Sequence, residues 1–220
     1  RQMCIRDSLN TIYFKDEWMD RFERRQTKPD AFYVSAQQTV QCDYMNRTYA
    51  MHPYTRGEGF TRSALSLKNG GRMVFILPDQ GVSVDTLLAS PQKAASLFLG
   101  VDRGTGKVVF QIPKFSFGSK LNLKKTLHAM GVRCAFESDQ ADFSGMTQDQ
   151  AFFSQILQET HIAIDEKGVE AAAFTKLDYA GTAAPNEKEA YMILNRPFLY
   201  GIVSDGVLLF AGVCNQPAES

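Results

Sequence analysis

The sequence predicts an α+β fold of multi-stranded β-sheets with flanking helices. Apolar runs rich in β-branched and aromatic residues recur along the chain, whereas stretches with helical spacing of apolar residues are few. Near the C-terminus two apolar runs are joined by Ser204-Asp205-Gly206, which is typical of a β-hairpin. Strands that follow one another without intervening helices favour antiparallel or mixed sheets. The 220 residues suffice for one large domain or two small ones.

The expected strands share a high content of Val, Ile, Leu, Phe and Tyr. They are Leu9–Phe14, Ala31–Val34, Gln38–Asp43, Met73–Leu77, Val108–Phe117, Phe153–Ile164, Phe198–Val203 and Val207–Val213. The run Met73–Leu77 is continuously apolar and stops at Pro78-Asp79, which indicates a core strand. Pro113 lies inside Val108–Phe117 and favours an edge or bulged strand there, because proline cannot donate a ladder hydrogen bond.

Two stretches predict helices. Val82–Leu99 has apolar residues at helical spacing and contains Pro91, which indicates one or two helices. Leu121–Met130 is expected to be a helix that ends at Gly131. The run Gly104-Thr105-Gly106-Lys107 lacks the spacing of a phosphate loop, and Val108 follows where Ser or Thr is needed. A hairpin turn is therefore the better interpretation of that run.

Residues 165–190 form a long, polar stretch rich in small residues, of the kind that is usually functional or disordered. From Val169 to Tyr179 the odd-numbered positions are mostly small or apolar and the even-numbered positions mostly polar. This alternation is typical of a strand. The part Glu170–Lys176 is equally compatible with a short Ala-rich helical turn. The stretch 165–190 would therefore fit a segment that is a loop in one state of the protein and a strand in another.

Composition and spacing exclude several functions. The 24 Lys and Arg balance 24 Asp and Glu, which argues against a nucleic-acid binder. The sequence contains no run of 18 apolar residues, so we expect no membrane span. The four cysteines lie far apart without metal-ligand spacing, and His52, His128 and His161 occur in no catalytic motif. We therefore expect no enzyme activity, no metal and no cofactor. Residues 1–8 resemble neither a signal peptide nor a natural start, and we interpret them as a non-native tail.

Several segments, in the same order along the chain, resemble the serpin family. These are LNTIYFKDEW (9–18), MVFILPDQG (73–81), FQIPKFSF (110–117), ADFSGMT (141–147), IDEKGVEAAA (164–173) and NRPFLYGIVSDGVLLFAGVCNQP (195–217). The resemblance implies a serpin-like fold with an exposed reactive-centre loop at about 166–190. It covers only the C-terminal part of a single serpin domain, here 9–220. The family's N-terminal helices and first two strands of its main sheet have no counterpart in this chain.

The resemblance also implies roles for particular residues. Glu166 and Lys114 match a salt bridge near the start of the loop, and Trp18 matches an aromatic residue of the same region. Asn10 matches a polar residue that controls strand separation in the middle of the main sheet. Its usual histidine partner is Gln158 here, and a glutamine is still able to hydrogen-bond.

The hinge implied by the family pattern is rich in small residues. Its residues are Glu166, Gly168, Val169, Glu170, Ala171, Ala172 and Ala173. Counting Glu166 as the first residue places the bait residue seventeenth, so the reactive bond would be Thr182–Ala183. Counting back from Asn195 places the bond later, nearer Asn186. A small bait residue suits the narrow pockets of elastase-like or subtilisin-like proteases.

The function that the resemblance implies is protease inhibition by a suicide substrate. The protease cleaves the loop, forms an acyl-enzyme and is trapped when the loop inserts into the main sheet. The alternatives are a non-inhibitory serpin that acts as a carrier or chaperone, and an inactive truncated fragment. Most relatives are secreted, so we expect an extracellular protein that is a monomer at full length. The 220 residues by themselves are expected to present an open sheet edge and not to inhibit.

Overall fold

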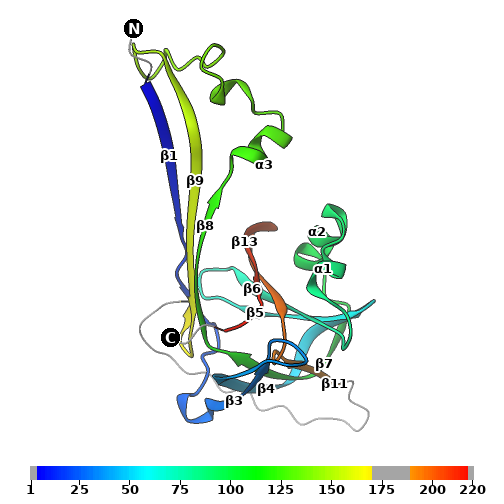
Figure 1. Cartoon of the computed structure of the whole chain (residues 1–220). Helices are drawn as coiled ribbons and strands as arrows, with labels where there is room; N and C mark the ends of the chain where they lie inside the picture. The colour runs from blue at the N-terminus through cyan, green and yellow to red at the C-terminus, as the bar shows by residue number, and fades with distance from the viewer. Residues whose placement is uncertain (1–3, 170–188, 218–220) are drawn as a thin grey trace. The chain divides into compact units, whose positions relative to one another are not determined.

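The computed structural model describes residues 4–169 and 189–217. The described chain is rich in strands and has few helices (Figure 1). The strands are β1 (Cys4–Tyr13), β2 (Asp16–Glu17), β3 (Lys28–Tyr33), β4 (Thr39–Gly57), β5 (Phe60–Ser66), β6 (Arg72–Pro78), β7 (Gly104–Pro113), β8 (Phe115–Asn122), β9 (Ala151–Ile164), β10 (Gly168–Val169), β11 (Glu189–Ile193), β12 (Phe198–Ser204) and β13 (Val207–Cys214). The helices are α1 (Val84–Leu87), α2 (Pro91–Leu99) and α3 (Lys124–Ala129), with 3₁₀ turns η1 (Arg24–Gln26) and η2 (Cys134–Phe136).

The chain divides into two compact units. The first contains residues 1–14 and 117–162, and the second contains residues 15–116 and 163–220. In the first unit β1 and β9 pair in parallel, from Cys4 opposite Ala151 to Tyr13 opposite His161, and β8 lies on the other side of β9. The ion pair of Lys120 with Glu159, 2.7 Å from Nζ to Oε1, joins β8 to β9.

β1 forms the outer strand of this sheet in the described part of the chain. Leu9 is 61% exposed and Tyr13 is 57% exposed. The structure extends the predicted strand Leu9–Phe14 backward to Cys4, so Cys4–Ser8 pair with β9. Because this edge is open and carries exposed apolar side chains, we expect the 220 residues by themselves to aggregate.

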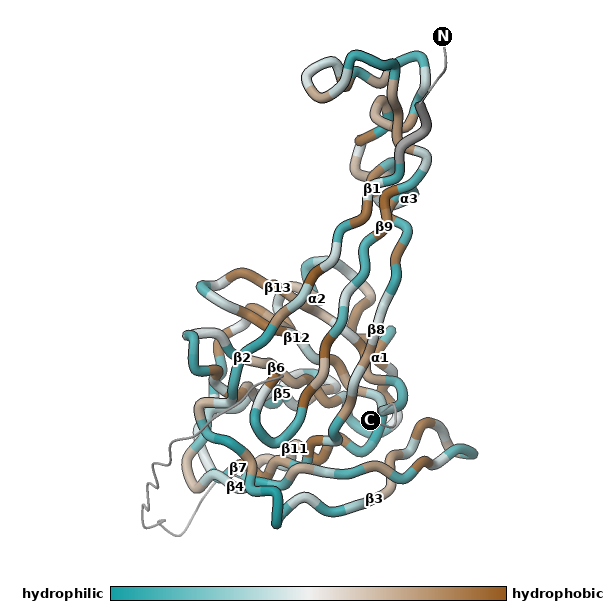
Figure 2. Tube along the Cα trace, turned by 90° about the vertical axis from the view of Figure 1, so that its left-hand side faces the viewer, coloured by the Kyte–Doolittle hydropathy of each residue, from teal (hydrophilic) through white to brown (hydrophobic). Residues whose placement is uncertain are grey.

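The second unit is built on an eight-stranded sheet. Its strand order is β11-β7-β4-β5-β6-β12-β13, with β3 paired to β4. Hydrophobic residues run along β12 and β13 (Figure 2), and every residue of β12 before Ser204 is buried. Helix α2 contacts β12 and β13. One apolar cluster contains residues of α1, α2, β6 and β12. The cluster consists of Val74, Ile76, Leu87, Leu97, Phe98, Leu199 and Val203.

The C-terminal hairpin confirms its predicted turn. Asp205 has φ 48° and Gly206 has φ 77°, so both residues adopt the left-handed conformation of a two-residue type I′ loop. Glycine adopts this conformation at no steric cost, and aspartate tolerates it. The pairing extends from Ser204 opposite Val207 to Phe198 opposite Cys214, with one register shift between Ile202 and Val203. The core strand predicted at Met73–Leu77 is also confirmed, as β6.

Three predictions about local structure are wrong. The predicted strand Val108–Phe117 is divided at Lys114, and the edge alternative is wrong because β7 pairs with both β4 and β11, although its pairing with β4 contains a register shift between Tyr49 and His52. The proline is accommodated because Pro113 is the last residue of β7. The run Gly104–Lys107 opens β7 and does not form a turn. Helix α3 begins only at Lys124, because Leu121 and Asn122 extend β8.

Candidate functional site

The first element of the site is the tight turn after β9, at residues 165–168. The Asp165 carboxylate accepts hydrogen bonds from the backbone N–H groups of Lys167 (2.8 Å) and Gly168 (3.2 Å). The Asp165 N–H donates to the Gly168 carbonyl at 3.0 Å. An aspartate that binds its own backbone in this way is typical of turns. The chain therefore reverses direction and continues into β10.

Strand β10 pairs antiparallel with β2, with Gly168 opposite Glu17 and Val169 opposite Asp16. Both β10 residues are buried. A Cβ atom on Gly168 would lie 2.4 Å from the Asp16 carbonyl oxygen and 2.4 Å from the Glu17 Cα. Real Cβ contacts are never this short, so only glycine permits the two backbones to approach. Gly168 also has φ 156°, a conformation that residues with a side chain rarely adopt.

Substitution of Gly168 by alanine is expected to lower the stability of the second unit by about 1–3 kcal/mol, because the added methyl group must push β2 and β10 apart. Urea denaturation followed by the fluorescence of Trp18, the single tryptophan of the chain, measures this loss. The matched control is Gly118→Ala, because a Cβ atom there meets nothing within 4 Å. Equal midpoints for the two variants would contradict the close approach at Gly168.

Glu166 is the buried acid of the site. Glu166 is only 5% exposed to solvent. The Thr27 hydroxyl donates to Oε1 at 2.8 Å, and the Lys114 ammonium lies 3.5 Å from Oε2. The Glu166 carbonyl also accepts from the Phe22 N–H at 3.0 Å. The structure thus brings together Glu166 and Lys114, the pair for which the sequence predicted a salt bridge.

The pKa of Glu166 is lowered below its ordinary value. Burial by itself raises this pKa, but hydrogen bonds from the residue's own backbone and from Thr27, together with the charge of Lys114, outweigh that effect. A lowered pKa in the folded state means that the carboxylate stabilises the fold above the unfolded pKa of 4.5. The contribution is lost as the pH falls through the folded pKa.

We expect the tryptophan emission to stay constant from about pH 7 to about pH 5 and to shift to the red below about pH 4.5 as Glu166 is protonated. The reason is that the Trp18 backbone and Glu166 belong to the same network of hydrogen bonds. The variant Glu166→Gln is expected to remove the shift, and Glu58→Gln, at an exposed position, to retain it. An unchanged acid transition in Glu166→Gln would assign the transition to another group.

Trp18 is fully buried and lies against the same turn. Its Nε1–H donates to the Asp165 carbonyl at 2.8 Å, and its backbone N–H donates to the Lys167 carbonyl at 3.1 Å. Its ring meets Phe22 edge-on, with centroids 6.0 Å apart. Trp18 therefore serves both as core packing and as a hydrogen-bond donor to the turn.

Charged residues anchor β2 from its other side. The Asp16 carboxylate accepts from the Asn69 side chain at 3.0 Å and from the Asn69 N–H at 3.3 Å. Glu17 lies between Lys68 at 2.5 Å and Arg21 at 2.6 Å, and their hydrogen bonds, that of Lys68 foremost, lower its pKa. Sequence reasoning missed Asp16, Asn69 and the turn residue Asp165. The only signal was local, since an aspartate three residues before a glycine favours a turn.

The predicted mid-sheet pair belongs to the first unit. Asn10 and Gln158 are register partners in the parallel pairing of β1 with β9. Within the described residues no side-chain hydrogen bond joins these two amides. Their role in strand separation stays a prediction. Glu170, Ala171, Ala172, Ala173, Thr182 and Ala183 lie outside the described residues.

No group of three or more His, Cys, Asp or Glu side chains that could hold a metal ion occurs in the part of the chain that the structure describes. The contacts around Glu166 are instead those of a structural anchor. Its charge is neutralised by Lys114, and its oxygens are occupied by hydrogen-bond donors of the same unit. The site is therefore suited to fixing the start of the segment that follows residue 169.

Comparison with known proteins gives consistent results. Residues 8–217 match the family profile described as serpin (serine protease inhibitor). The chain is 33% identical over 215 residues to an α-1-antitrypsin homolog of Cyprinus carpio, which covers 96% of this chain and 56% of the relative. It is 30% identical over 212 residues to intracellular coagulation inhibitor 2 of Tachypleus tridentatus, covering 93% of this chain and 51% of that relative.

Solved structures give the same fold. Serpin48 of the insect Tenebrio molitor superposes with a TM-score of 0.80 at 28% identity, covering 96% of this chain and 56% of that one. Human thyroxine-binding globulin, complexed with its hormone, also reaches a TM-score of 0.80, at 25% identity and with the same coverage. The chain thus spans about half the length of the relatives that it matches.

Proposed function

Because the chain belongs to the serpin family, we propose that the protein inhibits a protease as a suicide substrate. Residues 166–190 would be the reactive-centre loop, and the protease would be trapped when this loop inserts into the sheet that contains β1 and β9. Family membership rests on the match over residues 8–217. The relatives are about twice as long as this chain, so the activity is proposed for the whole protein.

The observation that carries the proposal is the reversal of the chain between β9 and β10. The turn at Asp165 reverses the chain locally, within residues 165–168. Gly168 and Val169 are already paired as strand residues, and Val169 is completely buried. The loop that follows therefore starts as the first residues of a strand.

The proposed chemistry at the bond Thr182–Ala183 is acyl transfer. The protease serine or cysteine attacks the Thr182 carbonyl carbon and forms an ester or thioester. The bond to the Ala183 nitrogen breaks, and this nitrogen leaves as an amine after it takes a proton from the protease's general acid. The new C-terminus at Thr182 stays attached to the protease while the freed segment inserts. Hydrolysis by water would regenerate the protease, so insertion must be faster.

The size of the effect can be estimated from the chain length. From Gly168 to Thr182 a strand at about 3.3 Å per residue extends roughly 50 Å, which would carry the attached protease a long way from its first position. About a dozen new backbone hydrogen bonds at roughly 1 kcal/mol each give on the order of 10 kcal/mol. The inward positions Ala171, Ala173 and Thr175 are small and uncharged, as insertion between two strands requires.

A second candidate function is that of a non-inhibitory carrier. The similarity to thyroxine-binding globulin at a TM-score of 0.80 favours it, since that protein was solved with bound hormone. A carrier would not need an insertable hinge, and bulky or charged residues at the inward positions would mark it. Those positions hold Val169, Ala171, Ala173 and Thr175, which favours inhibition. An inactive fragment remains the third reading for the 220 residues alone.

The proposed partner is a target protease of the elastase-like or subtilisin-like kind, because Thr182 is small. We propose an extracellular location, although one similar protein is named an intracellular coagulation inhibitor. Among the described residues no helix is long and apolar enough to span a bilayer. The proposal involves neither a cofactor nor a nucleic acid.

The test uses the protein in the longest form that its gene encodes, with the 220-residue chain beside it. Each is mixed with elastase-like, subtilisin-like, trypsin-like and papain-like proteases and run on denaturing gels. A band at the summed mass that survives denaturation is expected for at least one protease, together with release of a peptide that begins at Ala183. Cleavage of the loop without such a band for any protease would overturn suicide inhibition and favour the carrier.

A further inference from the structure

A surface pocket of about 470 Å³ lies in the second unit at the start of β11. It is lined by Tyr54, Thr55, Arg56, Arg103, Gly104 and Glu189. Tyr54, Thr55 and Arg56 lie near the end of β4. Gly104 is the first residue of β7 and lies opposite Tyr54. The pocket shares no residue with the turn around Glu166. Its volume lies within the range of sites for small molecules.

The pocket carries an excess of positive charge. The Glu189 carboxylate accepts from the Tyr191 hydroxyl and from Lys107 at 2.9 Å, and both contacts, that of Tyr191 foremost, lower its pKa. Asp102, beside the pocket, is paired with Arg62 at 2.8 Å. Neither acid therefore neutralises Arg56 or Arg103. Within the described residues these two arginines form no ion pair.

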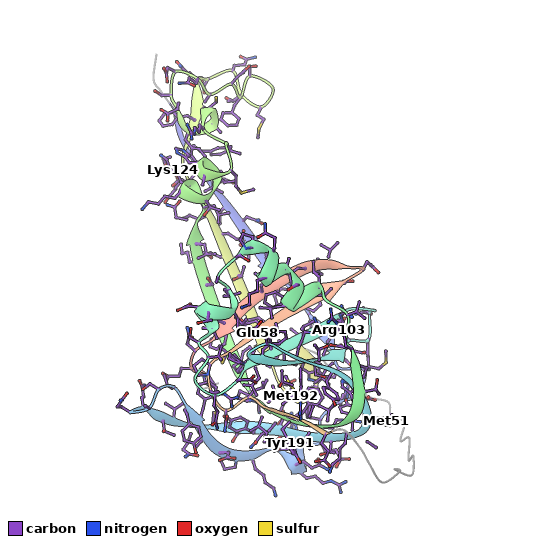
Figure 3. The ribbon with its side chains drawn as sticks, turned by 90° about the vertical axis from the view of Figure 1, so that its right-hand side faces the viewer. Met51, Glu58, Arg103, Lys124, Tyr191 and Met192 are labelled. Carbon is purple, nitrogen blue, oxygen red and sulfur yellow. The ribbon has the colours of Figure 1, made fainter. Side chains whose placement is uncertain are left out.

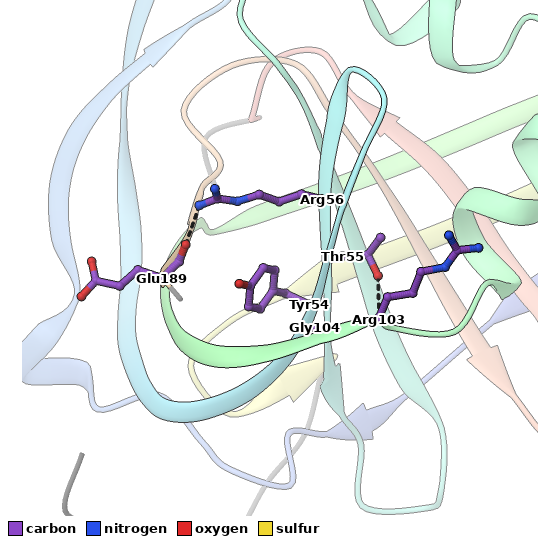
Figure 4. A pocket seen from close by; sticks show the side chains of 6 residues that line it. All are labelled: Tyr54, Thr55, Arg56, Arg103, Gly104 and Glu189. Atoms are coloured by element: carbon purple, nitrogen blue, oxygen red, sulfur yellow. Dashed lines mark hydrogen bonds between the residues drawn. The ribbon is translucent and has the colours of Figure 1, made fainter. Parts of the chain in front are cut away.

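Most of the N–H donors of Arg56 are not used by the hydrogen bond to Glu189. Its Nη2 donates to the backbone carbonyl of Glu189, and Figure 4 shows its side chain reaching toward that residue. A guanidinium carries five N–H donors and has no acceptor, so most of its hydrogen-bonding capacity is open to a ligand. Arg103 is exposed, and its backbone N–H donates to the Thr55 hydroxyl at 3.1 Å. Paired N–H donors of arginine match the oxygens of a carboxylate.

The pocket also has an apolar wall. The ring of Tyr54 points toward Glu189 (Figure 4), although the residue is only 5% exposed to solvent. A Cβ atom on Gly104 would lie 3.3 Å from the Tyr54 carbonyl oxygen and 3.4 Å from the ring Cζ. Gly104 therefore lies close to the ring, and a larger side chain there would crowd it. Neighbouring β11 points Tyr191 outward and buries Met192, so the strand that borders the pocket is firmly seated (Figure 3).

We propose that this pocket binds a small organic carboxylate with an apolar or aromatic body. Arg56 would bind the carboxylate, Arg103 would add a second positive charge, and the body would lie over Gly104 and the edge of Tyr54 that borders the pocket. The combination of a few placed polar groups with an aromatic wall is typical of small-molecule sites. The proposal does not depend on protease inhibition, because none of the pocket residues belongs to the hinge.

The experiment uses 4-phenylbutyrate as the probe and the full 220-residue chain. Line broadening of the probe's NMR signals measures binding, since it reports on the ligand even when the chain associates. We expect saturable binding with a dissociation constant on the order of 1 mM, as suits about a dozen non-hydrogen atoms. The uncharged 4-phenylbutyramide is expected to bind at least about 10-fold more weakly, because it lacks the charge-assisted hydrogen bonds.

Variants locate the site. Arg56→Gln is expected to weaken binding about 10-fold and Arg103→Gln about 3-fold, whereas Arg56→Lys keeps the charge and part of the affinity. Lys125→Gln removes an exposed cation from the first unit and is expected to change nothing. Unchanged emission of the buried Trp18 shows that each variant is folded.

Four results would each overturn the proposal, and three of them concern 4-phenylbutyrate and its amide. They are equal binding of the acid and the amide, equal weakening by Arg56→Gln and Lys125→Gln, and no binding of the acid at 10-fold the expected constant. Binding of N-acetylglutamate as tight as that of 4-phenylbutyrate would also contradict it. That result would show that the body is not recognised and that an acidic side chain of another protein is an equal ligand.

Discussion

An arginine in place of Ala171 is expected to abolish the covalent protease complex while leaving cleavage of the loop intact. Ala171 follows the buried Val169 by two residues, so in a continued strand both side chains point to the same face. Insertion would bury the guanidinium between two strands without a partner, at a cost of several kcal/mol. A cost of about 3 kcal/mol in the transition state slows insertion roughly 100-fold, and hydrolysis of the acyl-enzyme then wins.

The matched control for this prediction is Ala172→Arg, on the opposite face by the same alternation. This variant adds the same charge one residue away and is expected to form the complex nearly as well as the unaltered protein. The measurement is the fraction of protease recovered in the denaturation-resistant band at equal inhibitor concentration. If Ala171→Arg and Ala172→Arg trapped the protease equally, insertion in the predicted register would be refuted.

Replacement of Arg62 by methionine is expected to destabilise the second unit by about 3–5 kcal/mol. The Arg62 side chain is only 4% exposed and donates to Asp102 through both Nε (3.1 Å) and Nη2 (2.8 Å). Its Nη1 donates to the carbonyls of Ser96 and Leu97 in the last turn of α2, both at 3.2 Å. Its loss would leave the nearly buried Asp102 carboxylate with only the Thr55 hydroxyl, at 3.3 Å, and would remove the guanidinium donor from two helix carbonyls.

Urea denaturation followed by Trp18 fluorescence measures this change. Arg103→Met is the control, because it removes an exposed arginine adjacent in sequence to the same aspartate and is expected to cost less than about 0.5 kcal/mol. The double variant Arg62→Met/Asp102→Leu is expected to recover at least about 1 kcal/mol, because the unpaired carboxylate is gone. A cost for Arg62→Met no larger than that for Arg103→Met would mean that the buried pair contributes nothing.

The same ion pair illustrates what sequence reasoning missed. Arg62 and Asp102 lie 40 residues apart, and each is an ordinary charged residue in the sequence. The long strand β4 was predicted only in its first part, since from Tyr44 onward polar and bulky residues interrupt its alternation. β7 pairs with this part of β4 from Tyr44 to Tyr54, and β5 pairs with its last residues, from Tyr54 to Gly57. The pocket beside β11 depends on this arrangement and had no signal in the sequence.

The sequence by itself determined the fold class, the family, the C-terminal hairpin and the partnership of Glu166 with Lys114. These depend on local patterns, such as the apolar run of β6 and the turn residues Asp205 and Gly206, or on motifs in a fixed order along the chain. Tertiary structure alone decided that β7 is an inner strand, that Gly168 must be small and that Thr27 and Trp18 bind the turn. Each of these depends on distances between segments far apart in sequence, which no local pattern records.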